Sequence, residues 1–353
     1  MNYRLNPTSK ITKGFSRSII IDLEKELFYL IPNAMADIFT QYPFGDQIDM
    51  LSKFKEIKVK NIVKEYFDFL IERDLIFFTN HPDNYVDLKL VWEYPGSISN
   101  AIIDYNSDFV FYYNTFLQFI DDSGCKSIQI RIFKKVDFKS FLNIFVWFED
   151  SGIENVEIIC HYNEEFEDEI IIANFERFQR IKLITYFNFP SNKILYEKQL
   201  KTGKIVGIKQ NLSNSSCCGN INSSYFQPTI SFVSESIKHN TCLNRKISID
   251  FEGNIKTCPS AKEVIGHITT INFNEGLINS KLKKYWDINK DEINTCKDCE
   301  FRYICSDCRA YLEQPNDIYS KPIKCGYNPY TCEWEEWNTS REKLDIFSKN
   351  YLK

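Results

Sequence analysis

The sequence predicts an α/β protein built in three parts. Its 353 residues exceed one ordinary core, because domains average about 150 residues. Strand-like and helix-like patterns alternate between residues 88 and 217, which indicates a parallel sheet with covering helices. Ten of the 12 cysteines lie between Cys217 and Cys332, so the last third differs in kind from the rest. We therefore divide the chain into residues 1–82, 83–217 and 218–353.

The first part combines a hairpin, helices and a closing strand. We expect strands over 15–22 and 26–31, helices over 33–39 and 58–73, and a closing strand over 75–78. In the longer helix the spacing places Ile62, Tyr66, Phe69 and Leu70 on one face. This order of elements resembles a small winged-helix domain.

The second part reads as a strand and helix repeat. We expect strands over 98–104, 127–133, 156–160 and 181–186, with helices over 109–121, 138–150 and 168–178 between them. About five strands are too few for a complete eight-stranded barrel. An incomplete α/β barrel or an open sheet is therefore expected.

Charge and hydropathy exclude two classes of partner. The net charge of −5 lacks the basic excess of a chain that wraps nucleic acid. No stretch approaches about 18 uninterrupted apolar residues, and the first residues lack the apolar core of a signal peptide. We expect a cytoplasmic protein with neither nucleic acid nor membrane as a partner.

The cysteines of the third part have the spacing of metal ligands. Cys296 and Cys299 form one Cys-x2-Cys pair and Cys305 and Cys308 another, followed by Cys325 and Cys332. Upstream, a hairpin expected over 246–251 and 254–257 carries Cys242 and Cys258 near its ends. Buried free cysteines would be the plain alternative, but so many at chelating spacings favour ligation. Two zinc ions and two cubane iron–sulfur clusters both fit the ligand count.

These residues resemble a known family. The arrangement Cys242, Gly253-x4-Cys258, Cys296-x2-Cys299-x5-Cys305, Cys308 and Cys325 is similar to the SPASM domain, the auxiliary-cluster domain of radical-SAM peptide-modifying enzymes. More narrowly, segments 240–250, 258–260 and 296–310, with 17–19 and 31–33, resemble the SPASM-domain peptide maturases that accompany an ATP-grasp ligase, the grasp-with-spasm type.

The resemblance implies two 4Fe–4S clusters in place of zinc. Its ligands would be Cys242, Cys258 and Cys308 for the first cluster and Cys296, Cys299, Cys305 and Cys325 for the second. The fourth ligand of the first cluster is open: Cys218, which precedes Gly219, is our candidate, with Cys217 and Cys332 as weaker ones. The gap between Cys305 and Cys308 is one residue shorter than usual in the family.

The catalytic motif of radical-SAM enzymes is absent from the sequence. Those enzymes hold their reactive cluster with Cys-x3-Cys-x2-Cys after the first barrel strand, and residues 105–113 contain no cysteine. No two cysteines anywhere are four positions apart. We therefore do not expect S-adenosylmethionine as a cofactor, and the resemblance leaves open whether the chain is an enzyme.

The first part also resembles a precursor-peptide recognition element, which adds a leader peptide to a sheet edge beside a helix. The groove would lie between the 15–31 hairpin and the 58–73 helix. That helix mixes Glu65, Asp68 and Glu72 with lysines, which disfavours a DNA-reading role. We expect the protein to act in maturation of a ribosomally made peptide beside an ATP-grasp ligase. It would be either a maturase whose clusters act on the peptide or a non-catalytic adaptor with structural metal.

Overall fold

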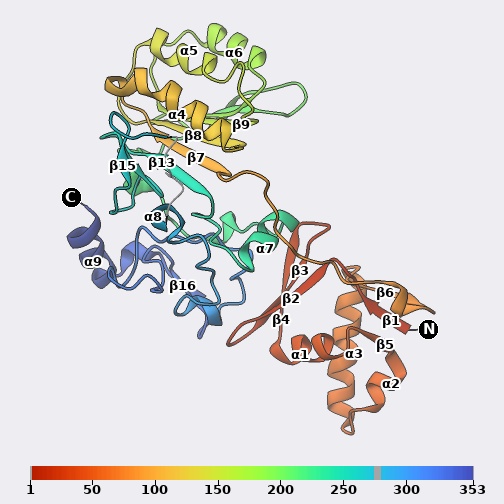
Figure 1. The fold of residues 1–353 in the computed structure, drawn as a ribbon. Helices are drawn as coiled ribbons and strands as arrows, with labels where there is room; N and C mark the ends of the chain where they lie inside the picture. The colour runs from red at the N-terminus through yellow and green to blue at the C-terminus, as the bar shows by residue number, and fades with distance from the viewer. Residues whose placement is uncertain (1, 274–279, 353) are drawn as a thin grey trace.

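The protein is a mixed α/β structure with a large nine-stranded sheet (Figure 1). The computed structural model describes residues 2–273 and 280–352. The sheet and its helices lie at one end of the molecule, the N-terminal part lies at the other, and the C-terminal loops lie below the sheet. No helix among the described residues is long and apolar enough to cross a membrane.

The N-terminal part contains two three-stranded sheets. The sequence predicted three of their six strands, namely the two strands of a hairpin and a closing strand. The first sheet joins β5 (Phe44–Asp46), β1 (Asn2–Leu5) and β6 (Ile76–Thr79), and the second joins β2 (Ser9–Lys13), β3 (Ser18–Asp22) and β4 (Leu27–Ile31). The helices are α1 (Asn33–Gln41), α2 (Gln47–Ser52) and α3 (Ile57–Glu72). The predicted closing strand is β6, and it pairs with β1 instead of the hairpin.

Helix α3 buries a stripe that differs from the predicted one. Val63, Phe67 and Leu70 are buried, whereas Ile62 is 44% exposed. The sequence contains two overlapping apolar stripes at helical spacing, and the core takes the one that includes Phe67. The other stripe faces β4, where the Phe69 and Tyr29 rings meet edge to face at 6.3 Å.

The large sheet has a parallel centre and antiparallel margins. Its order is β11 (Lys193–Glu197), β12 (Lys204–Gly207), β10 (Ile181–Phe187), β9 (Asn155–His161), β8 (Ser127–Ile132), β7 (Asn100–Asp104), β13 (Lys246–Ile249), β14 (Asn254–Lys256) and β15 (Gly266–His267). Strands β12, β10, β9, β8, β7 and β13 are parallel. The predicted hairpin is confirmed as β13 and β14, and it extends the sheet beside β7.

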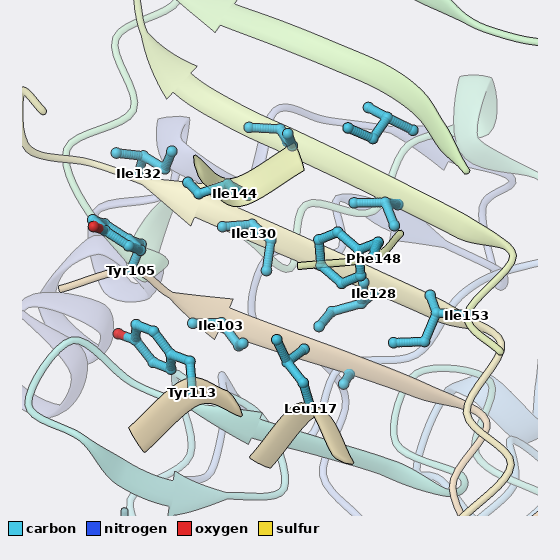
Figure 2. Close-up of a cluster of buried hydrophobic side chains, with 14 of the residues drawn as sticks. Ile103, Tyr105, Tyr113, Leu117, Ile128, Ile130, Ile132, Ile144, Phe148 and Ile153 are labelled. Atoms are coloured by element: carbon cyan, nitrogen blue, oxygen red, sulfur yellow. The ribbon is translucent and has the colours of Figure 1, made fainter. Parts of the chain in front are cut away.

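Helices cover one face of this sheet. They are α4 (Val110–Asp122), α5 (Phe138–Val146) and α6 (Asp168–Arg177), and α5 ends four residues before the expected end of its helix. Figure 2 shows the core beneath them, where alternate strand residues such as Ile103, Ile128 and Ile130 meet Leu117 and Phe148. Gln129 and Glu157 have the opposite parity on β8 and β9, and the Gln129 Nε2 donates to the Glu157 Oε2 at 3.0 Å.

The C-terminal part is made mostly of loops. Its regular elements are α7 (Ile230–Ser236), α8 (Ser280–Lys283), the pair β16 (Tyr327–Asn328) and β17 (Glu333–Trp334), and α9 (Arg341–Tyr351). Strand β3 connects it to the N-terminal part. Ile20 of β3 packs toward α1 and α3, whereas Ile19 and Ile21 pack against Phe301, Ile304 and Cys305.

Candidate metal centres

Four thiols gather around the hairpin of β13 and β14. Cys242 precedes the hairpin, Cys258 follows it, and Cys218 and Cys308 come from separate loops. Burial, followed by the charges of Cys242 and Cys218, raises the pKa of Cys258 to about 12. Burial and the charges of Cys242, Cys218 and Cys258 likewise raise the pKa of Cys308. The first predicted set, with Cys218 as its fourth member, is thus brought together in space.

Gly219 brings the backbone close to this first set. Its φ of +83° lies in the left-handed region, which glycine adopts without steric cost. A Cβ atom there would lie 3.0 Å from the Cys308 Sγ and 3.0 Å from the Tyr311 ring. Glycine after Cys218 therefore lets the backbone pass close to Cys308. This close approach explains why a glycine follows Cys218.

A second group of four thiols lines one cavity. Cys296, Cys299, Cys305 and Cys325 share it with Phe226, Phe301, Tyr327 and Trp334. Burial is the largest cause of the raised pKa of Cys296, which reaches about 12, and the charge of Cys325 adds to it. Burial and then the charges of Cys305, Glu300 and Cys296 raise the pKa of Cys299. These are the four residues of the second predicted set.

Each thiol set has a lysine beside it. Lys290 is 5% exposed, and its Nζ lies 3.0 Å from the Cys305 Sγ and donates to the Ser306 carbonyl at 2.9 Å. The Lys246 Nζ lies 3.6 Å from the Cys242 Sγ. Neither lysine forms an ion pair with a carboxylate in the described part of the chain. Neither lysine was predicted as a site residue, because lysines are frequent and no motif marks these two.

The remaining candidates occupy the margins of the two sets. Burial lowers the pKa of Lys324, and the nearby Cys308, Cys218 and Cys217 offset this in part, so Cys217 lies close to the first set. Cys332 lies beside the Tyr327 hydroxyl, which itself borders the second cavity. Cys125 and Cys160 are buried in the hydrophobic core of the large sheet. Within residues 2–273 and 280–352, no group of three or more His, Cys, Asp or Glu side chains is placed to hold a single metal ion.

At the carboxyl end of β7 lies an ion pair. Asp104 accepts hydrogen bonds from the Arg131 Nε at 2.6 Å and pairs with its Nη2 at 2.5 Å, and both side chains are nearly fully buried. The following loop is closed by the Tyr113 hydroxyl, which accepts from the Asn106 N–H at 2.9 Å. This is the place where the sequence lacks the three-cysteine motif.

Comparison with known proteins assigns the chain to no family. No family model matches the chain, and no curated protein matches it.

Proposed function

We propose that this protein acts in the maturation of a ribosomally made peptide, working beside an ATP-grasp ligase. Its N-terminal part would bind the precursor leader, and its two thiol sets would hold two 4Fe–4S clusters. The resemblance to SPASM-domain maturases supplies the class of process. The contact between Lys290 and Cys305 is the structural observation that most supports metal binding by the second thiol set.

A buried ammonium needs an anionic partner, because an isolated charge in a low-dielectric interior is strongly disfavoured. The nearest sulfur to Lys290 is that of Cys305 at 3.0 Å. The nearby Asp307 is already paired with Arg309 at 2.6 Å. Burial raises the pKa of the Cys305 thiol, and the charge and hydrogen bond of Lys290 offset this rise in part, so Lys290 favours the thiolate form that a metal group would need.

In number and chemical type the donors match a thiolate-bound metal group, although the described thiols are not placed around a single ion position. Iron–sulfur clusters are held by four cysteine thiolates, and hydrogen bonds to the sulfurs and nearby charge tune them. Cys218, Cys242, Cys258 and Cys308 would hold the first cluster, with Lys246 beside it, and Cys296, Cys299, Cys305 and Cys325 the second. Such clusters supply electron transfer and, where one iron is open, a site for a substrate sulfur or nitrogen. They also stabilise a loop-rich domain outright.

The leader would bind at the free edge of β4. This strand ends the order β2, β3, β4, so within residues 2–273 and 280–352 its outer backbone groups have no neighbouring strand. Leu27 and Leu30 on it are 49% and 46% exposed. Arg73 of the α3 C-cap lies beside this strand, with its guanidinium carbon 5.6 Å from the ring centre of Tyr29. An extended peptide adding to this edge would gain main-chain hydrogen bonds and apolar contacts with α3.

A non-catalytic adaptor is the second candidate function. The buried pair of Asp104 and Arg131 lies at the end of β7, where a radical-SAM enzyme holds its reactive cluster. An adaptor would present the leader-bound precursor to the ligase, and its clusters would serve the fold.

A reconstituted ligase reaction tests the proposal. The precursor, the ligase and ATP are incubated with and without this protein, and products are followed by mass spectrometry. We expect this protein to accelerate water loss from the full precursor and not from a leaderless one. A mass change caused by this protein without the ligase would select the maturase over the adaptor. Equal ligase rates with and without it, and no mass change by it alone, would contradict both.

A further inference from the structure

A second cavity opens at the carboxyl ends of the central strands. It has a volume of about 650 Å³, within the usual range for ligand sites. Asp104 lies at its β7 side, Phe133 and Lys134 follow β8, and Asp250 to Glu252 form the turn after β13. Open α/β sheets bind ligands at this edge.

The cavity carries a surplus of positive charge. Two of its carboxylates are already neutralised: Asp104 by Arg131, and Asp250 by Lys256 at 2.6 Å. Lys134, Lys262 and Lys349 also line it, and none of them has a carboxylate partner in the described ranges. Glu252 is the single lining carboxylate that is likewise unpaired there. Among the described lining residues, three lysines without a carboxylate partner thus face one unpaired carboxylate, although the whole chain is acidic at −5.

The same cavity borders the first thiol set. Ser215 and Ser216 line it just before Cys217 and Cys218, and Pro259 and Ser260 line it just after Cys258. The Tyr311 hydroxyl and the Ser260 hydroxyl both donate to the Ser215 carbonyl, at 3.2 and 3.1 Å. This wall is therefore tied to the loops that carry the thiols.

Its surface suits a peptide more than a compact anion. The Lys134 ammonium lies 4.1 Å from the Phe251 ring centre and the Lys262 ammonium 5.0 Å from the Tyr351 ring centre, so cationic groups alternate with rings along the wall. Long lysine side chains of this kind can cover an apolar chain while their ammonium groups meet its carboxylates.

We propose that this cavity binds a carboxylate-bearing segment of the precursor, outside the leader, and holds it next to the first thiol set. The inference rests on the proposed function: a ligase that joins side chains by ester or amide links needs a substrate with side-chain carboxylates. The leader edge at β4 and this cavity would then hold two different segments of one peptide.

The experiment uses the full-length protein and a synthetic leaderless peptide that carries four glutamates between apolar residues. A second peptide replaces each glutamate by glutamine. Binding is measured by fluorescence anisotropy at low salt, for the protein and for the K134Q/K262Q/K349Q variant. The control variant K139Q/K209Q/K238Q removes three exposed lysines that do not line the cavity.

We expect the glutamate peptide to bind about tenfold more tightly than the glutamine peptide. The cavity variant should remove this difference, because it lacks the three ammonium groups that would pair with the glutamates. The control variant should keep it. The inference would be overturned if the two peptides bind equally or if the cavity variant keeps the preference for glutamate. It would also be overturned if ATP displaces the labelled peptide and unlabelled glutamate peptide does not. A labelled leader peptide, titrated in parallel, reports the β4 edge alone, so failure there is separable from failure at the cavity.

Discussion

Arg17 reaches from the N-terminal part to a fully buried carboxylate in the cysteine-rich part. Its Nε donates to the Glu300 Oε1 at 2.7 Å, and the Tyr327 hydroxyl donates to the same oxygen. Glu300 directly follows Cys299, and Tyr327 borders the second thiol cavity. A second link is the Phe15 N–H, which donates to the Asp298 carbonyl at 2.8 Å. The predicted peptide-binding part is thus fastened to the loop that carries the second thiol set.

Arg17→Ala should destabilise the protein by about 3 kcal/mol, because it leaves the buried Glu300 without its cation. Urea unfolding measures this loss. Arg177→Ala is the matched control: its pair with Glu149 has side chains 65% and 45% exposed, so about 0–1 kcal/mol is expected. A loss for Arg17→Ala no larger than that of the control would show that the interface contributes little.

Lys290→Met should weaken the second metal group and leave the first in place. It removes the cation beside Cys305, so the reduction equilibrium of that cluster should shift at least tenfold toward the oxidised form, about 59 mV for one electron. Potentiometric titration followed by EPR measures the shift. Lys297→Met, an exposed lysine between Cys296 and Cys299, is the control. Equal reduction potentials for the two variants would show that Lys290 does not tune the second cluster.

Gly219→Ala should reduce the metal content of the first set. The added Cβ would crowd the Cys308 Sγ at 3.0 Å, and the left-handed backbone adds about 1–2 kcal/mol of strain. Metal analysis of the purified variant should show loss from one set only. Gly45→Ala also changes a glycine with positive φ, but its Cβ has no neighbour nearer than 3.9 Å, so full metal content is expected. Full content in both variants would contradict the placement of Cys308 beside Cys218.

Leu30→Asp should lower leader affinity about tenfold or more. The leucine is 46% exposed on the β4 edge, and covering such a side chain on binding is worth about 1.5–3 kcal/mol when burial is complete. Fluorescence anisotropy with a labelled precursor measures the change. Ile194→Asp places the same charge on the exposed edge strand β11 of the large sheet and should leave affinity unaltered. If both variants bind the leader like the parent protein, the β4 edge is not the leader site.

Local sequence patterns predicted many of the helices and strands. The helix expected over 58–73 is α3 at Ile57–Glu72, and the strand expected over 181–186 lies within β10 at Ile181–Phe187. Both have strong periodicity within a single element. Strand β1 was missed because Asn2–Leu5 alternates polar and apolar residues over only four positions, and β2 was missed because Ser9–Lys13 contains a single apolar residue, Ile11.

The pairing of strands that are distant along the chain could not be predicted from the sequence. The hairpin of β13 and β14 was predicted, but nothing local indicates that Lys246–Ile249 pairs with β7, about 145 residues earlier. Spacing identified cysteines of the last third as candidate ligands, since Cys-x2-Cys is a local signal, and the resemblance to the SPASM domain divided them into two sets. Lys290, Glu300 and the cavity lysines could not be found in this way, because burial and partner choice arise only when distant loops meet.

Whether the two thiol sets hold two cubane clusters is decided by anaerobic purification followed by iron, sulfide and zinc analysis with EPR. We predict about eight irons and eight sulfides per chain, falling by about half in the Cys296→Ala/Cys299→Ala variant. About two zinc ions per chain without sulfide would contradict the cluster assignment and leave a structural metal domain in an adaptor. A protein that folds with neither metal would contradict ligation by either thiol set.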